Sequence, residues 1–474
     1  MSRLWKSVSS KSDVLFVDLG VHFLGDLKGL HYGGYIPYGL LCVASYAEHS
    51  GFRPAALMMD HVFPAPFTGT REELDTITRD VLEQEIRAGR PGIFALGMPY
   101  TFQFNYMLRI MRMVKEINPD ILTVIGGTHT SVLYKQCLDD CPDVDVVVRG
   151  EGELTMTEIL GAHQQKQKLD DISGISLRVD GKVANTGRRK FMDMSTAPMV
   201  KFDLLPNKFY AGKMINISPN RGCEFKCRFC EEQIFWGNSI RSITPDRVMA
   251  EVESIISHNY DYTMISLEDS MFDLRSAWFH ELADKMSRNK KKRLGYCVTR
   301  VDSVDEDGLA AAAKMGLFAI LFGVESGSEK VLGTVDKGIT YEQVKKALKM
   351  SKKQGIYNGT LWVVGLPGDD QVESQKSYDF METLYSEELT DIAAISRMVP
   401  YPGTPIFAAP KKYGVKILHY DWERWLRFTK DGCAELTDFS DQQITECYEE
   451  IFTMARTMEF NRKKALKVTD LIRY

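Results

Sequence analysis

The sequence lacks the features of three common classes of protein. Basic residues are not in excess, since 59 Lys and Arg stand against 64 Asp and Glu, for a formal net charge of −5. The chain therefore has no electrostatic footprint for nucleic acid or for an anionic membrane surface. Its most apolar long window, Leu309 to Val324, is interrupted by Lys314 and Gly316, so we expect no membrane span. The N-terminus leads into a strand-like run without a signal-peptide pattern, so we expect no export.

The cysteines also lack the arrangement of a disulfide framework. Of nine cysteines, three are clustered between residues 223 and 230 and the other six are scattered. A secreted disulfide scaffold would instead carry paired cysteines at high density along a short chain. We therefore expect free thiols in a reducing compartment and assign the protein to the cytoplasm.

The order of apolar and amphipathic segments predicts several domains, because 474 residues are too many for one compact core. Strand-like and helix-like segments alternate first, which predicts a doubly wound, Rossmann-like parallel sheet. After a hairpin that turns at Asp180-Gly181, alternation resumes from Ile215 for about six strands, fewer than a full barrel needs. The predicted α/β architecture has a Rossmann-like domain (1–165), a linker with a hairpin (166–212), a partial (β/α)6 barrel (213–407) and a helical C-terminal segment (408–474).

One loop carries the strongest chemical signal. The stretch NRGCEFKCRFCEEQIFWG, residues 220–237, contains Cys223, Cys227 and Cys230 and follows a strand-like segment. The cysteines therefore lie at the carboxyl edge of the predicted barrel, where barrel enzymes have their active sites. Three thiolates bind either zinc or an iron–sulfur cluster. A structural zinc site is normally closed by a nearby fourth Cys or His, and none follows, whereas three thiolates on a [4Fe–4S] cluster leave one iron open.

The spacing Cys-x3-Cys-x2-Cys, with Phe229 before the last cysteine, resembles the signature of the radical S-adenosylmethionine (SAM) enzymes. The resemblance implies that the three cysteines hold a [4Fe–4S] cluster, that SAM is the fourth ligand and that Phe229 is a cofactor contact. It also implies reductive cleavage of SAM to a 5′-deoxyadenosyl radical, which removes hydrogen from a substrate. A structural zinc site and an iron–sulfur redox sensor or electron carrier are the alternatives. In a sensor or carrier, SAM would leave the EPR signal of the cluster unchanged.

Further segments fall where the same family carries its SAM contacts. Glu268 and Asp269, in ISLEDS, are expected to accept hydrogen bonds from the SAM ammonium, with capping of a helix by Asp269 or Ser270 as the alternative. Arg300, in CVTRVD, is expected to pair with the SAM carboxylate unless it forms a surface salt bridge. The remaining expected contacts are Glu325 and Ser326 in FGVESGS, for the ribose or ammonium, and the backbone of Val364, Gly365 and Leu366 in VVGLPG, for the adenine.

Residues 13–160 resemble the cobalamin-binding domain attached to one large class of radical SAM enzymes, through YGGYIPYGLLCVASYAEHSGF, ALGMPYTF, TVIGGTHTS and DVVVRGEGELT. The resemblance implies that Gly126, Gly127 and Thr128 contact the corrin from a loop at the carboxyl ends of the strands. It places the corrin between this domain and the barrel mouth. The Asp-x-His-x-x-Gly motif, by which some cobalamin proteins ligate cobalt, is absent, and we interpret His129 as a loop histidine. A domain that binds cobalamin and one that has lost it both stay open.

The segment after the cysteines, CEEQIFWGNSIR, resembles the same segment of anaerobic magnesium-protoporphyrin ester cyclases and of aminoglycoside radical dehydratases. With cobalamin, the class implies methyl transfer to an unactivated carbon of a small specialised metabolite. Without cobalamin, the radical would drive dehydration, cyclisation or rearrangement. Tyr210, Glu231 and Glu232 flank the cysteine loop as candidate general acids or bases for such a step. The expected partners are a small-molecule substrate and an external electron donor such as flavodoxin or ferredoxin.

Overall fold

The computed structural model describes residues 10–20, 36–63, 67–205, 213–258, 260, 262–289, 291–429 and 432–463. The chain divides into two compact units, Met1–Lys213 with Tyr260–Tyr262 and Met214–Asn259 with Thr263–Tyr474. Tyr210 and the start of the YGGYIP motif, residues 32–35, lie outside the described residues. None of the helices in the described ranges combines the length and apolar character needed to cross a membrane.

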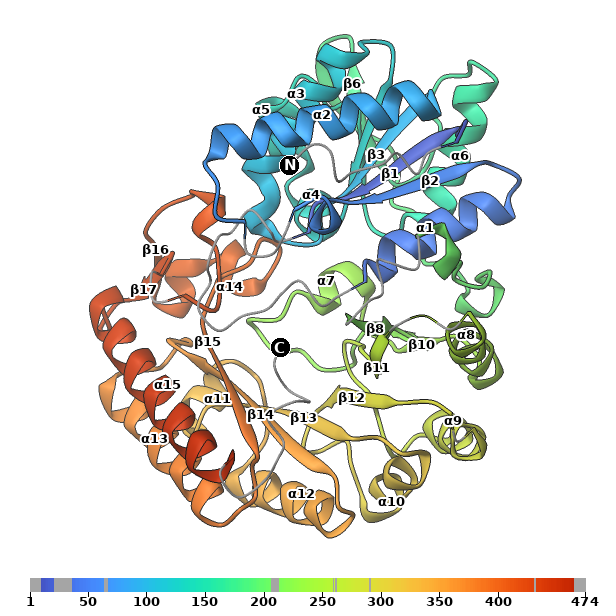
Figure 1. Cartoon of the computed structure of the whole chain (residues 1–474). Helices are drawn as coiled ribbons and strands as arrows, with labels where there is room; N and C mark the ends of the chain where they lie inside the picture. Colours follow the sequence, from blue (N-terminus) through green and yellow to red (C-terminus); the bar gives the residue numbers. More distant parts are fainter. Residues whose placement is uncertain are drawn as a thin grey trace. The chain divides into compact units, whose positions relative to one another are not determined.

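The first unit is built on a seven-stranded sheet in the order β2-β1-β3-β4-β5-β6-β7 (Figure 1). The strands are β1 (Val14–Asp18), β2 (Pro54–Met58), β3 (Ile93–Gly97), β4 (Leu122–Gly126), β5 (Val146–Val148), β6 (Ile175–Val179) and β7 (Lys182–Asn185). The helices are α1 (Tyr38–His49), α2 (Arg71–Gly89), α3 (Phe104–Ile117), α4 (Thr128–Val132), α5 (Tyr134–Asp140) and α6 (Glu153–Gln164). Strands β1 to β5 pair in parallel, so this part has the doubly wound order 2-1-3-4-5.

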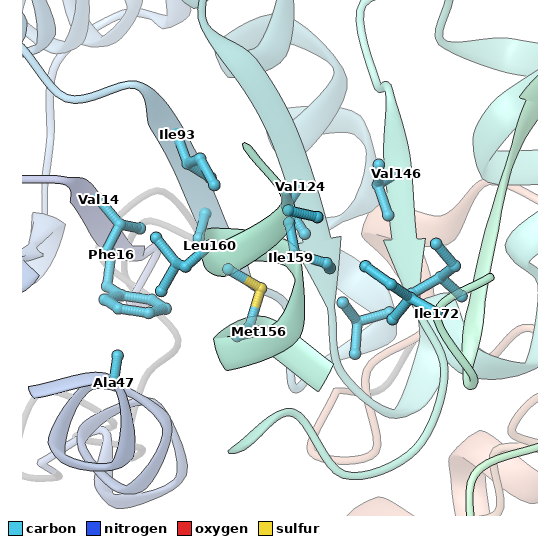
Figure 2. Close-up of a cluster of buried hydrophobic side chains, with 14 of the residues drawn as sticks. Val14, Phe16, Ala47, Ile93, Val124, Val146, Met156, Ile159, Leu160 and Ile172 are labelled. Carbon is cyan, nitrogen blue, oxygen red and sulfur yellow. The ribbon is translucent and has the colours of Figure 1, made fainter. Parts of the chain in front are cut away.

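The core of this sheet follows from strands that are apolar on both faces. Val14, Phe16 and Ile93 from β1 and β3 pack with Met156 and Ile159 of α6, and all are buried. Figure 2 shows these side chains converging from several strands and from α6 on one cluster. Each fully buried aliphatic or aromatic side chain of this size contributes about 1.5–3 kcal/mol to folding. Helices therefore cover the sheet, as the alternating sequence pattern predicts.

The hairpin predicted at Asp180-Gly181 is formed by β6 and β7. Both turn residues have left-handed backbones, with φ of 50° at Asp180 and 74° at Gly181, which is the requirement of a type I′ turn. β6 pairs antiparallel with β5. The hairpin thus extends the sheet of the first unit, so the segment 166–212, predicted as a linker, contributes strands to that unit. The boundaries predicted at 165 and 212 stay predictions.

The second unit contains a six-stranded sheet in the order β15-β14-β13-β12-β11-β8. Its strands are β8 (Lys213–Ile217), β11 (Tyr262–Leu267), β12 (Leu294–Thr299), β13 (Ala319–Glu325), β14 (Tyr357–Val364) and β15 (Ile392–Arg397). Its helices are α7 (Glu232–Trp236), α8 (Pro245–Ser257), α9 (Ala277–Arg288), α10 (Glu306–Met315), α11 (Glu329–Thr334), α12 (Tyr341–Lys353), α13 (Gln371–Ser386), α14 (Pro405–Ala408) and α15 (Asp441–Lys463). Strands β11 to β15 pair in parallel, and helices follow the outer face of the sheet (Figure 1). The prediction of a partial six-stranded barrel is confirmed.

Local sequence signals start the helices of this unit. A Ser, Thr or Asp side chain accepts a hydrogen bond from the first turn at seven of them, namely Thr244 for α8, Ser276 for α9, Asp305 for α10, Ser328 for α11, Thr340 for α12, Asp370 for α13 and Thr404 for α14. The apolar window from Leu309 is the end of α10, a left-handed Gly316 and the buried strand β13. The interruptions at Lys314 and Gly316 thus mark the end of a helix and a turn before a strand.

The C-terminal segment combines helices with a pair of short antiparallel strands. β16 (Val415–Ile417) and β17 (Ala434–Leu436) pair antiparallel ahead of α15. The segment was predicted as helical, and its longest element, α15, is a helix. The two short strands were missed because each has only three residues and too little alternation to give a pattern.

Candidate functional site

The predicted SAM contacts of the second unit follow the ends of successive parallel strands. Glu268 comes directly after β11, Arg300 after β12 and Ser326 after β13, while Gly365 follows β14. Because the carboxyl ends of parallel strands share one edge of a sheet, these residues lie along the same edge. The cysteine loop starts at this edge after β8 and β9 (Asn220–Arg221).

The cysteine loop is held by backbone geometry at its start. Gly222 has a φ of 95°, and a Cβ there would lie 2.2 Å from the Ser239 carbonyl oxygen, so only glycine fits. β9 pairs antiparallel with β10 (Arg241–Ser242), which brings the two ends of the loop together. Asp269 accepts hydrogen bonds from the Asn220 amide, at 3.0 Å, and from the Asn220 side chain. The loop is thereby fastened to the end of β11.

The three clustered cysteines are free thiols and are partly exposed. Burial raises the pKa of each, while the Arg300 guanidinium acts in the opposite direction at Cys223 and Cys227. Within the described ranges, no three His, Cys, Asp or Glu side chains are placed around a single point as one metal ion would require. The structure therefore contains no closed mononuclear site in those ranges, and assignment of these thiols to a four-iron cluster rests on their spacing.

Arg300 is buried beside the cysteine loop. Its Nη1 lies 3.5 Å from Cys227 Sγ, and its guanidinium lies 3.7 Å from the centre of the Phe225 ring. Its Nε and Nη2 donate to the two carboxylate oxygens of Asp302, at 2.9 and 2.8 Å. Arg300 therefore does form a salt bridge, as the alternative predicted, but not on the surface, since its side chain is only 7% exposed. Its contact with SAM stays a prediction.

In contrast to the cationic Arg300, three residues of the site are acidic, namely Glu268, Asp269 and Glu232. Glu268 accepts a hydrogen bond from the Tyr296 hydroxyl, and burial raises its pKa to about 7. Burial also raises the pKa of Asp269, and repulsion from Glu232 and Glu268 adds to the effect. Glu232 accepts a hydrogen bond from Ser270, and burial raises its pKa as well. Crowded acids of this kind favour a cationic ligand, because a positive charge restores their ionised forms.

The helix-capping alternative for Asp269 and Ser270 is wrong. The next helix, α9, begins at Ala277 and is capped by Ser276. Asp269 instead fastens the cysteine loop through Asn220.

Of the other predicted contacts, Glu325 has a left-handed backbone with a φ of 67° and pairs with Lys337 at 2.8 Å. Ser326 lies 3.1 Å from the Ser377 hydroxyl, so its side chain is engaged within the barrel. Gly365 has a φ of 82°, and its amide donates to Asp369 at 2.8 Å. Phe229 is half-buried, whereas Val364 and Leu366 are buried.

The candidate general acids or bases lie on the segment after the cysteines. Glu231 and Glu232 begin α7, and burial, followed by repulsion from Glu232, raises the pKa of Glu231 to about 7. Their roles stay predictions.

In the first unit, the predicted corrin contacts lie at the carboxyl end of β4. Gly127 has a φ of 133°, and a Cβ there would lie 2.1 Å from the Met98 carbonyl oxygen. Thr128 donates to the Pro99 carbonyl at 2.9 Å, so the ends of β3 and β4 are tied together. His129 is buried with its Nδ1 3.2 Å from Thr101 Oγ1, and burial lowers its pKa to about 3. His129 lies within α4, so its interpretation as a loop histidine is wrong, and it is instead a buried residue of a short helix.

Sequence reasoning missed several residues that shape the site, namely Asn220, Phe225, Ser270, Tyr296, Asp302 and Lys337. Asp302 had a usable signal, because it stands two residues after Arg300 in the segment already identified. Lys337 had none, because it lies 12 residues beyond Glu325 and outside every quoted motif.

The chemistry of the donor sets fits the implied cofactors. Three thiols on one loop, with the cationic Arg300 beside Cys227, suit an anionic iron–sulfur cluster. The crowded acids suit the ammonium and sulfonium of SAM. In the first unit, glycine backbone ends β3 and β4, next to the switch point between β1 and β3 where doubly wound sheets bind ligands.

Two family models match the chain. The B12 binding domain model matches residues 31–160, and the Radical SAM superfamily model matches residues 217–381. The first match falls in the unit with the doubly wound sheet, and the second begins at the end of β8.

Curated relatives and a solved structure agree with these matches. An uncharacterised methyltransferase of Pyrococcus horikoshii is 28% identical over 344 residues, which is 71% of this chain and 72% of the relative. The anaerobic magnesium-protoporphyrin IX monomethyl ester cyclase of Rubrivivax gelatinosus is 28% identical over 74% of this chain and 64% of the cyclase. The radical SAM methyltransferase TsrM of Kitasatospora setae, solved with cobalamin and a [4Fe–4S] cluster, has a TM-score of 0.72 at 15% identity over 94% of this chain and 89% of TsrM.

The fold and the site define an enzyme in which a B12-binding domain precedes a radical SAM domain. The chain is similar to methyltransferases and to cyclases of the magnesium-protoporphyrin type. The Radical SAM domain implies a [4Fe–4S] cluster and SAM as cofactors, and the match to the B12 binding domain model is the observation that supports cobalamin as a third.

Proposed function

We propose that this enzyme methylates an unactivated carbon of a small specialised metabolite. The observation that carries the proposal is the pairing of a three-thiol loop at the carboxyl edge of the radical SAM barrel with a B12-binding domain in the same chain. The similarity to the Pyrococcus methyltransferase over most of both chains supports methyl transfer.

In the barrel, we assign different roles to the thiols, the basic residue and the acidic residues. Cys223, Cys227 and Cys230 would hold the cluster, and Arg300 would offset its negative charge at Cys227. Glu268 and Asp269 would attract the cationic groups of SAM, because burial raises the pKa of both acids, and repulsion from Glu232 and Glu268 adds to this at Asp269, so a positive partner would favour their ionised forms. The chemistry supplied at this site when it is loaded is reductive cleavage of SAM to a radical, with cobalamin as the source of methyl. The protein binds and orients these groups at the end of the barrel.

In the first unit, Gly126, Gly127 and Thr128 would contact the corrin. Glycine at the first two positions lets a large planar ligand approach the backbone. His129 is buried and stands outside an Asp-x-His-x-x-Gly motif, so we do not assign it to cobalt.

A second candidate reaction is cyclisation, dehydration or rearrangement without methyl transfer. The match to the magnesium-protoporphyrin ester cyclase over 374 residues favours it. Glu231 and Glu232 would then act as general acid or base from the start of α7, and Tyr210 is a further candidate. Because the cleavage of SAM is reductive, we also infer an external electron donor such as flavodoxin or ferredoxin. From the free thiols we infer a reducing cytoplasm.

The proposal is tested by anaerobic reconstitution of the full chain with iron, sulfide and hydroxocobalamin, followed by desalting and metal analysis. We expect about four irons and one cobalt per chain, and formation of 5′-deoxyadenosine from SAM under reduction. The variant Cys230→Ala should lose most of the iron and keep the cobalt. Cys42→Ala, a partly buried cysteine of α1, is the matched control and should keep both. Four irons without cobalt would exclude the methylase and leave the cyclase-type reaction, and absence of iron in the wild type would overturn both.

A further inference from the structure

A tight turn after α11, Val335–Gly338, contacts the cysteine loop as well as Arg300 and Glu325. Asp336 and Gly338 both have left-handed backbones, with φ of 58° and 67°, which is uncommon for a residue other than glycine and therefore notable at Asp336. Lys337, between them, is buried with 5% exposure. A buried lysine between two left-handed residues has to be held by specific partners.

The backbone of this turn contacts the cysteine loop and Arg300. The amide of Arg228, the residue after Cys227, donates to the Val335 carbonyl at 2.9 Å. The Lys337 carbonyl accepts from Arg300 Nη2 at 2.6 Å. The turn therefore orients the guanidinium whose Nη1 lies beside Cys227.

The side chain of Lys337 reaches the end of β13. Its Nζ lies 2.8 Å from Glu325 Oε1, and both side chains are nearly buried. Glu325 has a left-handed backbone, and the pairing of β13 with β14 shifts register between Gly323 and Glu325, which re-aims the side chain. A Cβ at Gly323 would lie 2.6 Å from Glu325 Oε1 and 2.8 Å from Lys337 Nζ, so the missing side chain makes room for the ion pair.

The ion pair also lies close to the cysteine loop. Arg300 connects the two, because its Nη2 donates to the Lys337 carbonyl at 2.6 Å and its Nη1 lies 3.5 Å from Cys227 Sγ. A positive charge on Lys337 and a negative charge on Glu325 therefore lie in the surroundings of Cys227, where they would act on a bound cluster with opposite signs.

From this geometry, and resting on the proposed function, we infer that Lys337 is a positioning residue of the SAM and cluster site. Its ammonium holds the Glu325 carboxylate in its strained orientation at the barrel edge, and its charge stabilises the cluster bound at Cys227 in its reduced, more negative state. Removal of Lys337 should loosen SAM binding and make the cluster harder to reduce. Removal of the Glu325 charge should loosen SAM binding but make the cluster easier to reduce.

The test compares Lys337→Met, Glu325→Gln and the double variant with wild type after anaerobic reconstitution. The readouts are iron content, the midpoint potential of the cluster from an EPR-monitored redox titration, and the SAM affinity from the change in EPR signal. We expect about four irons in each protein and a SAM affinity about tenfold weaker in both single variants. The potential should move to more negative values in Lys337→Met and to more positive values in Glu325→Gln, with the double variant between them.

Opposite shifts of the midpoint potential distinguish an effect of charge from structural damage, because general loosening of the barrel would shift the potentials of both single variants in the same direction. Lys330→Met, which removes an exposed lysine of α11 paired with Asp370, is the matched control and should match wild type. If Lys337→Met fails to fold because Glu325 is left buried without a partner, the double variant must still lie at a more negative potential than Glu325→Gln. Unchanged potentials or shifts of the same sign would overturn the inference, while a wild type without a cluster would instead overturn the proposed function.

Discussion

At the scale of single residues, left-handed and glycine backbones occur at the functional ends of both sheets. Gly127 follows β4 in the first unit, and Gly222 and Glu325 occur at the barrel edge in the second. Such positions are costly for most residues and persist where the surrounding structure holds them. They are therefore places where stability and ligand binding are coupled.

Replacement of Gly127 by Ala should destabilise the first unit by about 2 kcal/mol or more. Its φ of 133° and ψ of −179° are accessible to glycine, and the new Cβ would clash with the Met98 carbonyl. Gly161→Ala is the control, because Gly161 lies within α6 with open space around it and should gain about 0.5–1 kcal/mol in helix propensity. Urea denaturation followed by circular dichroism measures both. Equal effects at the two positions would contradict the prediction.

Asp18 makes the stability of the first unit depend on pH. Burial, and next repulsion from Asp60, raises its pKa from 3.8 to about 7, although the Gly20 amide donates to it at 2.9 Å. The native state therefore keeps a proton that the unfolded chain releases, so stability falls as the pH rises from about 4 to about 7. Asp18→Asn removes this loss, and its gain in stability over wild type should grow across that window, to about 4 kcal/mol at most.

The measurement is urea unfolding of both proteins at several pH values between about 5 and 8. Asp13→Asn, just before the same strand, is the control, and we expect it to change stability in the opposite direction. Its pKa is lowered by the hydrogen bond from Arg53, so neutralising it should reduce stability at neutral pH. A stability difference between Asp18→Asn and wild type that does not change with pH would contradict the raised pKa.

At the scale of elements, α15 closes the open edge of the barrel sheet. β15 is the edge strand, and its Ala393 amide donates to the buried Glu459 of α15 at 3.2 Å. At the other end of the strand, Arg397 donates to Asp441 and Thr445 of α15 at 2.6 and 2.7 Å. A covered edge cannot pair with a second chain, so the helix protects the sheet.

Arg397→Met should release the start of α15 and lower stability by about 1–2 kcal/mol, because the variant removes charged hydrogen bonds from a side chain that is 2% exposed. Hydrogen exchange should become faster in α15 and in β15 and stay unchanged in β11. Lys416→Met, which removes a lysine that is 70% exposed from its pair with Glu435, is the control and should change stability by less than about 0.5 kcal/mol. Unchanged exchange in α15 would show that the helix is held by its apolar contacts alone.

At the scale of the whole molecule, each unit has its own sheet. The seven-stranded sheet and the core around Phe16 and Ile159 lie within the first unit. We therefore propose that this unit is a folding domain, and that residues 1–213 expressed alone unfold in one cooperative thermal transition. Loss of cooperative unfolding in this fragment, as judged by circular dichroism, would show that the short segment Tyr260–Tyr262 or other parts of the chain are required.

Sequence patterns predicted the architecture well because they are local. Alternation of strands and helices indicated both sheets, and the turn at Asp180-Gly181 was correct because two left-handed residues in a row define a hairpin. The cysteine loop was found for the same reason, since its three thiols lie within eight residues of the chain. The short strands β16 and β17 were missed because three residues carry no period.

By itself, the sequence determined the two α/β blocks, the three-thiol loop and which charged residues follow the ends of the barrel strands. Only the tertiary structure decided what those residues contact. It brought Asp269 into contact with Asn220, 49 positions away, and Arg300 into contact with Cys227, 73 positions away. It also brought Lys337 to Glu325 over the space left by Gly323. Such pairings depend on which strand ends become neighbours and on how side chains pack there, and no local pattern in the chain carries that information.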